Sequence, residues 1–156
     1  MLVSLSGRMG VVTGGGSGIG RACALSLARA GADVAVFDRD EHAGKATAVE
    51  INTRIAAAGL GGNATFVPVD VSCRKDVTEA IVTAQKKLGG TLSHAVNCAG
   101  ITCDGWMSKM TDEDWDRVLN INLKGTFILT QAVSNAIMEN NKRTGEVTPG
   151  SIVNIS

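Results

Sequence analysis

Glycines crowd one short segment of the sequence, TGGGSGIG, which runs from Thr13 to Gly20. The preceding MGVVT has the β-branched character of a strand, and residues from Gly18 to about Ala30 are typical of a helix that Gly31 ends. The glycines at 14, 18 and 20 have G-x-x-x-G-x-G spacing. A backbone without Cβ atoms turns tightly and admits a ligand, and the new helix offers unpaired N–H groups to an anion. This strand–turn–helix setting predicts a dinucleotide-binding turn rather than a plain flexible loop.

Strand-like and helix-like segments alternate along the rest of the chain. We expect further strands at 33–38, 64–71, 93–100 with its turn, and 151–156. Helices are expected over 41–58, ended by Gly59, then up to about Leu88, stopped by Gly89 and Gly90, and in a long segment that Thr111 opens with Asp114 in the manner of a capping box. Such alternation predicts an α/β fold, a doubly wound parallel sheet with helices on both faces.

Composition excludes several classes of protein. The chain has 156 residues, which is about one domain, and its 15 basic and 15 acidic residues form no block of either sign. This balance argues against a nucleic-acid or anionic-membrane partner. No apolar run approaches the ~20 residues of a membrane span. The four cysteines have neither C-x-x-C nor zinc spacing, so we expect no metal site and interpret them as small apolar residues rather than disulfide partners.

An acidic residue, Asp38, ends the second expected strand about 20 residues beyond Gly18. A carboxylate at this place can accept both ribose hydroxyls of NAD, and it would repel the 2′-phosphate of NADP. An alternative is that Asp38 caps the following helix. The neighbouring Arg39 could neutralise a phosphate. We therefore favour NAD as the cofactor, with NADP as the less favoured alternative.

Two later segments carry polar residues in apolar surroundings. Asn97 in NCAG can pin neighbouring strands, while Ala99 and Gly100 leave room for a ring; an ordinary strand-end turn is the alternative. In the long helix, Asn122 follows Trp115 and Leu119 on one face, and a glycine at 125 weakens the helix. Two explanations fit this pattern. Either Asn122 is a core asparagine whose hydrogen bonds are made, beside a glycine that allows close packing, or the helix is locally opened so that it serves a site.

Taken together, TGGGSGIG, the pair Asp70-Val71, NCAG and NINLKGTF resemble in order and spacing the motifs of the short-chain dehydrogenases/reductases. The resemblance runs from Met9 to Ser156 and is strongest to the 17β-hydroxysteroid dehydrogenase and 3-oxoacyl-[acyl-carrier-protein] reductase branches. It implies a Rossmann-type sheet in the strand order 3-2-1-4-5, with further strands and helices missing at the C-terminal side. A flavodoxin-like or other nucleotide-binding α/β domain fits the alternation but not the later motifs.

The resemblance also implies roles for individual residues. The cofactor-binding residues would be Gly14, Ser17, Gly18 and Ile19 at the pyrophosphate, Asp38 at the adenosine ribose, Asp70 and Val71 at the adenine, and Asn97, Ala99 and Gly100 at the inner ribose. Asn122 would be catalytic, with its carbonyl holding a water in a proton relay. NCAG departs from the family's usual NNAG, which leaves the expected fold unchanged.

The family's catalytic serine, tyrosine and lysine are not among these residues. Its fifth strand reads like IVNISS with the second serine catalytic, and a Tyr-x-x-x-Lys motif follows; this sequence ends at Ser156 and contains no tyrosine. Ser156 itself would face away, because successive strand residues point to opposite sides of the sheet. We therefore expect residues 1–156 to be a dinucleotide-binding Rossmann domain, truncated before the catalytic residues and inactive alone.

Two functions are consistent with this expectation. One is the N-terminal, cofactor-binding part of an NAD-dependent oxidoreductase acting on a secondary alcohol or ketone, either a 17β-hydroxysteroid or a 3-oxoacyl thioester. The other is a non-catalytic dinucleotide-binding chain that partners an intact subunit. The resemblance implies a small-molecule substrate, the mitochondrial matrix or alternatively the cytoplasm, and a homo- or hetero-tetramer that this part alone would not form normally. An exposed, uncharged SIVNIS edge would make the isolated chain poorly soluble.

Overall fold

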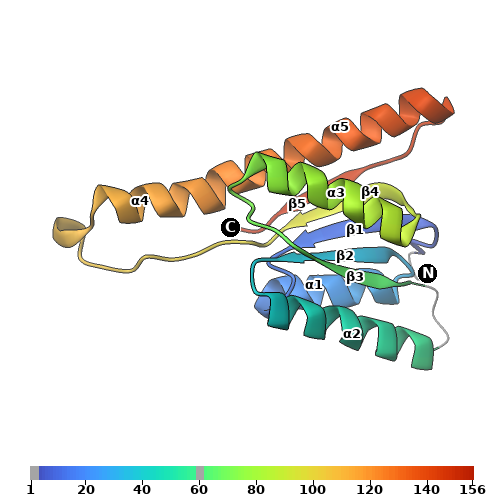
Figure 1. Ribbon diagram of the computed structural model, residues 1–156, viewed down its shortest axis with the longest axis horizontal. Coiled ribbons are helices and arrows are strands. Elements are labelled where there is room, and N and C mark those ends of the chain that lie inside the picture. The colour runs from blue at the N-terminus through green and yellow to red at the C-terminus, as the bar shows by residue number, and fades with distance from the viewer. Residues whose placement is uncertain (1–3, 59–61) are drawn as a thin grey trace.

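The computed structural model describes residues 4–58 and 62–156, and it shows one parallel sheet between two layers of helices (Figure 1). The strands are β1 (Arg8–Thr13), β2 (Asp33–Asp38), β3 (Ala64–Pro68), β4 (Thr91–Asn97) and β5 (Ser151–Asn154). They lie in the order β3-β2-β1-β4-β5, and every neighbouring pair is parallel. The Rossmann-type α/β fold and the strand order predicted from the sequence are confirmed.

In the described part of the chain, five α-helices connect the strands. They are α1 (Gly18–Arg29), α2 (Glu41–Ala57), α3 (Arg74–Leu88), α4 (Asp112–Leu119) and α5 (Thr126–Thr144). A short 3₁₀ turn, η1 (Met107–Lys109), precedes α4, and a π-helical segment, η2 (Asn120–Gly125), joins α4 to α5. α1 and α2 cover one face of the sheet, and α3 and α5 cover the other (Figure 1). This arrangement is the double winding that the alternation of segments predicts.

Glycines end the helices where the sequence places them. Gly31 and Gly89 have φ of 96° and 72°, a left-handed conformation that glycine adopts without strain. At the opposite end, the Thr111 side chain accepts a hydrogen bond from the Asp114 N–H at 3.1 Å, as the capping motif predicts. Gly59, expected to end the second helix, lies outside the described residues.

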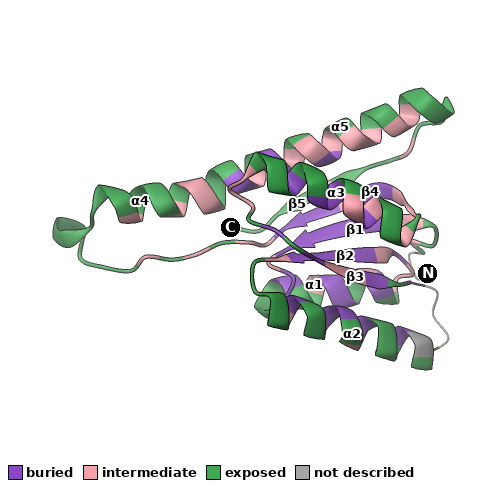
Figure 2. Cartoon of the chain, viewed as in Figure 1, coloured by how far each residue is buried: buried purple, intermediate pink, exposed green. Residues whose placement is uncertain are grey.

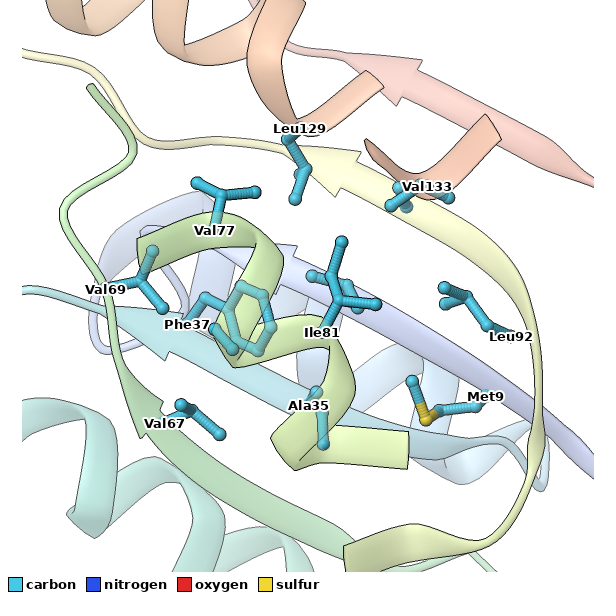
Figure 3. Packing of buried hydrophobic residues seen from close by; sticks show 14 of the residues in the cluster. Met9, Ala35, Phe37, Val67, Val69, Val77, Ile81, Leu92, Leu129 and Val133 are labelled. Atoms are coloured by element: carbon cyan, nitrogen blue, oxygen red, sulfur yellow. The ribbon is translucent and has the colours of Figure 1, made fainter. Parts of the chain in front are cut away.

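Strand β2 shows how the sheet divides the core in two. Val34 and Val36 face α1 and α2, whereas Ala35 and Phe37 face α3 and α5, and all four are fully buried. A strand covered on both faces reads as a continuous apolar run, as DVAVFD does. Figure 3 shows the α3–α5 half of the core, in which Phe37 lies among side chains from both helices and the sheet.

Several strand boundaries and one helix face differ from the sequence-based expectation, and the fifth strand, expected to reach Ser156, ends at Asn154. The third strand ends at Pro68 rather than at 71, because the chain turns where Ser72 donates to the Asp70 carboxylate. The fourth strand begins at Thr91, two residues earlier than expected. Every residue of α4 is exposed or half-buried, including Trp115 and Leu119, because α4 projects beyond the sheet (Figure 2). The apolar spacing of this helix therefore marks a solvent-facing stripe and not a core-facing one.

Candidate functional site

A cavity of about 330 Å³ opens at the carboxyl ends of the central strands. Open parallel sheets bind their ligands at this edge, and the volume lies at the lower end of the range for small-molecule sites. Its lining comes from the ends of β1 to β4, from the start of α1 and from η2: Gly14, Ser17, Gly18, Ile19, Gly20, Phe37, Asp38, Arg39, Val69, Asp70, Val71, Cys98, Ala99, Gly100, Ile101 and Ile121. Nine of the eleven predicted site residues are in this lining; Asn97 and Asn122 are outside it.

The glycine-rich turn and the NCAG turn are in close contact at the floor of this cavity. Gly14 has φ of 62°, and a Cβ there would lie 3.0 Å from the Cα of Ala99. Below it, the Thr13 hydroxyl accepts hydrogen bonds from the backbone N–H groups of Cys98 and Ala99, both at 3.2 Å. Two motifs separated by more than eighty residues thus form one continuous surface.

Two further glycines in the turn leave no room for a side chain. A Cβ at Gly16 would lie 2.8 Å from an oxygen of the Asp38 carboxylate, and one at Gly20 would lie 2.7 Å from the carbonyl carbon of Gly14. Contacts this short do not occur for real Cβ atoms. The glycines therefore allow α1 to start directly against the turn, with its first residues at the cavity wall.

The start of α1 has the electrostatic character of an anion site. Ser17 precedes the helix in an extended conformation, and its hydroxyl makes no capping hydrogen bond within the described chain. The first turn reads GIGR, so no carboxylate offsets the positive end of the helix dipole. N–H groups at such a helix end are the usual partners of a phosphate.

Asp38 is held in place by the backbone on both sides. Its Oδ2 accepts from the Gly16 N–H at 2.8 Å, and its Oδ1 accepts from the Asp40 N–H at 2.9 Å. A carboxylate has about four acceptor positions, and these two bonds occupy two of them. Asp40 takes the capping role of α2, because its own carboxylate accepts from the Ala43 N–H at 2.9 Å. The alternative that Asp38 is the helix cap is therefore wrong.

Charge at the adenine side of the predicted site comes from Arg39 and Asp70. Hydrogen bonds from the Ser72 hydroxyl, at 2.6 Å, and from the Ser72 N–H, at 2.9 Å, lower the pKa of the Asp70 carboxyl; partial burial opposes this shift, and the Arg39 charge adds to it. Asp70 consequently stays ionised at neutral pH. Arg39 lines the same cavity but is exposed to solvent.

Asn97 is a buried strand-end residue that joins three elements. Its Nδ2 donates to the Asn154 side chain on β5 at 2.8 Å and lies 3.3 Å from the Thr130 hydroxyl on α5. The structure thus has the strand-pinning contacts considered from the sequence. Its expected contact with the inner ribose stays a prediction.

Asn122 lies in the π-helical segment, with its side chain tied to the loop that leaves the NCAG turn. Its Oδ1 accepts from the Ile101 N–H and its Nδ2 donates to the Ile101 carbonyl, each at 2.9 Å. Its own carbonyl accepts from the Thr126 hydroxyl at 2.7 Å. Gly125 closes the segment, where a Cβ would lie 2.9 Å from a methyl carbon of Val71. The locally opened helix is confirmed, and Asn122 is exposed rather than a core asparagine.

Some contributors to the site were not identified from the sequence. Among them, the Thr13 hydroxyl has the clearest structural role. The sequence feature that could have identified it is its position as the first residue of the glycine motif. Phe37, Val69 and Ile121 line the cavity through apolar atoms that a motif does not reveal. Within residues 4–58 and 62–156, no group of three or more His, Cys, Asp or Glu side chains could hold a metal ion. No helix in that part of the chain is long and apolar enough to cross a membrane.

Comparison with known proteins agrees with this geometry. The family model of the short chain dehydrogenases matches residues 8–156. The mouse (3R)-3-hydroxyacyl-CoA dehydrogenase is 40% identical over 154 residues, which are 97% of this chain and 57% of the mouse protein. The hydroxyacyl-CoA dehydrogenase ChsB1 of Mycobacterium tuberculosis is 43% identical over 127 residues, which are 81% of this chain and 39% of that protein.

A solved structure has the same fold along almost the whole chain. It is a short-chain type dehydrogenase/reductase from Mycobacterium marinum, with a TM-score of 0.83 and 33% sequence identity. The match covers 98% of this chain and 57% of that one. The matches cover 57% of the mouse protein and of the M. marinum chain and 39% of ChsB1, so this chain spans about half the length of the relatives that it matches.

Proposed function

Because the chain belongs to the short-chain dehydrogenase/reductase family, we propose that residues 1–156 form a domain that binds NAD and serves an oxidoreductase reaction. The observation that carries the proposal is the cavity where the glycine-rich turn, the start of α1 and the NCAG turn meet. A Cβ atom at Gly14 would collide with the backbone of Ala99, so only glycine fits between the two turns. The N–H groups at the adjacent start of α1 are suited to a phosphate.

The residues of the lining support one orientation of the dinucleotide. The pyrophosphate would lie on Gly14, Ser17, Gly18 and Ile19, at the positive end of α1. The free acceptor positions of Asp38 would take the hydroxyls of the adenosine ribose, with Asp70 and Val71 beside the adenine. Ala99 and Gly100 would flank the inner ribose and the nicotinamide, with Asn97 behind them. NAD is favoured over NADP because the Asp38 carboxylate would repel a 2′-phosphate.

For the whole protein we propose hydride transfer between the nicotinamide and the carbon of a secondary alcohol or ketone. Asn122 would support proton transfer through its backbone carbonyl, to which Thr126 already donates one hydrogen bond, leaving a second lone pair for a water. The names of the similar mouse and mycobacterial proteins favour a hydroxyacyl thioester as substrate. A 17β-hydroxysteroid is the alternative.

We expect the purified chain to bind NADH with a dissociation constant on the order of 10 μM, and NADPH at least about tenfold more weakly. Isothermal titration calorimetry of each nucleotide measures both values directly. A folded chain, checked by circular dichroism, that gives no heat with NADH up to about 1 mM would contradict the proposal.

The second candidate function, a non-catalytic partner for another subunit, is favoured by an exposed apolar stripe. Trp115, Leu119, Leu123 and Phe127 recur every four residues along α4, η2 and α5, and Leu123 is 65% exposed. Asp116, Arg117 and Lys124 flank the stripe with both signs of charge. Apolar rows framed by complementary charges are typical of interfaces between copies of a helix pair, so we propose that a second copy covers this face.

Replacing Leu123 with glutamate is expected to shift the chain toward monomer, because a carboxylate at the centre of the stripe would be buried in the assembly. Analytical ultracentrifugation at several concentrations measures the change, with an expected weakening of about tenfold or more. Val49→Glu on α2 is the matched control, since Val49 is also 65% exposed but lies on another helix. An equal response of the two variants would refute the proposed face.

A further inference from the structure

Thr47, near the middle of α2, has a buried hydroxyl whose partner lies in the glycine-rich turn. The polar residues that are almost fully buried in the described chain are Thr13, Thr47, Ser93 and Asn97. Thr47 is 1% exposed and is not part of the cavity lining. Burying a hydroxyl costs free energy unless it makes a hydrogen bond, so the partner that it takes indicates its role.

The hydrogen bond of Thr47 leaves its own helix. A threonine in a helix can donate to the carbonyl four residues earlier, and this is the bond made by Thr53, Thr78, Thr83, Thr126 and Thr144. Thr47 Oγ1 instead donates to the carbonyl oxygen of Gly16 at 3.2 Å, 31 residues away in the sequence. The hydroxyl thus joins α2 to the turn before α1.

The helix α2 packs closely on the turn at the same point. Gly16 is buried, and a Cβ there would lie 3.0 Å from the Cβ of Ala43 and 3.0 Å from the backbone nitrogen of Gly44. Ala43 and Thr47 are four residues apart, so they lie on one face of the helix. This face supports the turn from behind, and Thr47 adds a directional polar contact to it.

We propose that Thr47 is a positioning residue for the pyrophosphate of the dinucleotide; this role rests on the proposed function. The Gly16 carbonyl and the Ser17 N–H belong to one planar trans peptide, so they point to opposite sides. Because Thr47 holds the carbonyl toward α2, the Ser17 N–H points away from α2, and Ser17 lines the cavity. No backbone carbonyl among the described residues accepts from that N–H. Thr47 would keep it directed at a phosphate oxygen.

The contact of Thr47 is separate from the contacts that hold Asp38. The N–H of Gly16 belongs to the preceding peptide, and it donates to Asp38 Oδ2 at 2.8 Å. The other oxygen of Asp38 accepts from the Asp40 N–H at 2.9 Å. Loss of the Thr47 hydroxyl is therefore expected to weaken the phosphate contacts and to leave the adenosine contacts nearly unchanged.

The substitution Thr47→Val tests this separation, because valine keeps the shape of threonine and removes the hydroxyl. NADH, ADP and adenosine are titrated into the folded chain and followed by NMR. We expect Thr47→Val to weaken NADH and ADP about tenfold and adenosine less than about twofold. General damage to the fold would weaken ADP and adenosine alike.

Three further variants act as controls. Thr47→Ser keeps the hydroxyl and should bind all three ligands within about twofold of the native chain. Thr53→Val removes a hydroxyl of the same helix that donates to the Val49 carbonyl at 2.8 Å, and it should leave binding unchanged. Thr47→Ala lacks the hydroxyl without adding bulk, so it should repeat the result of Thr47→Val even where valine packs poorly.

The chemical shifts of the unliganded chain test the hydrogen bond without a nucleotide. The carbonyl carbon of Gly16 and the amide nitrogen of Ser17 report on a bond to the carbonyl that they share. Both signals should move in Thr47→Val and Thr47→Ala and stay in place in Thr53→Val. Unmoved signals would overturn the proposal.

The binding results separate this inference from the proposed function. A native chain that binds neither NADH nor ADP would refute the proposed function, and this role with it. Native binding of NADH together with an unchanged ADP affinity in Thr47→Val would leave the proposed function standing and refute the role of Thr47. An equal weakening of ADP and adenosine would also overturn the positioning role, since it would show that the hydroxyl only stabilises the fold.

Discussion

Replacing Gly20 with alanine is expected to remove dinucleotide binding and to lower the free energy of unfolding by about 3 kcal/mol. The new methyl group would lie 2.7 Å from the carbonyl carbon of Gly14 and 3.2 Å from the Cα of Gly15. Both are backbone atoms of a turn that is itself pressed against Ala99. No flexible side chain can yield, so the start of α1 has to move away from the turn. Urea unfolding followed by circular dichroism measures the stability, and calorimetry with NADH measures binding.

Alanine substitutions at two other glycines are controls that distinguish the steric collision at Gly20 from the other effects of replacing a glycine with alanine. Gly18 has φ of 49°, and in the described chain no atom lies within 4 Å of its hypothetical Cβ, so Gly18→Ala adds backbone strain alone, about 1 kcal/mol. Gly105 has the same open surroundings without the positive φ, so Gly105→Ala should change stability by less than about 0.5 kcal/mol. If Gly20→Ala behaved like Gly105→Ala, the close packing of turn and helix would be wrong.

The layered sheet could be predicted because its signals are local. In β2, alternate residues go to opposite faces, and a run of apolar side chains such as Val34 to Phe37 is explained when helices cover both faces. Glycines at 31 and 89 end helices through their own backbone conformation, which needs no information from the rest of the fold. The order of the strands, by contrast, came from the resemblance and not from the residues themselves.

The exposed stripe on α4 could not be predicted in the same way. Spacing places Trp115 and Leu119 on one face of a helix, but it does not say whether that face meets the sheet. Here α4 lies beyond the sheet edge, and a 57% exposed tryptophan is the result. Likewise, the third strand ends at Pro68, before the turn in which Ser72 donates to the Asp70 carboxylate, and the β-rich composition of the segment hides this turn.

At the candidate site, residue types were predictable and their contacts were not. The glycine motif and NCAG were each recognised, yet the contact of Gly14 with Ala99 depends on β1 and β4 lying side by side. The Thr13 hydroxyl holds the second motif only because that register brings it there. Such long-range contacts are set by tertiary packing, which no spacing rule contains.

Substituting Asp38 with asparagine is expected to weaken NADH binding by about thirtyfold, because a charge-assisted hydrogen bond to the ribose is lost. Both oxygens of this carboxylate already accept backbone N–H groups, from Gly16 and Asp40. An amide has only one acceptor oxygen, so one of these N–H groups would face a donor and the turn would loosen. Weakened NADH binding alone could therefore reflect structural damage.

The ratio of the two nucleotide affinities removes this ambiguity. Damage to the turn would weaken NADH and NADPH alike, whereas loss of the negative charge acts only on the 2′-phosphate, which Arg39 could then meet without opposition. We expect the preference for NADH over NADPH to fall about a hundredfold in Asp38→Asn. Asp40→Asn removes the same charge two residues away and keeps an acceptor for the Ala43 N–H, so its preference should change less than about threefold. An unchanged ratio in Asp38→Asn would mean that this carboxylate shapes the turn without selecting the cofactor.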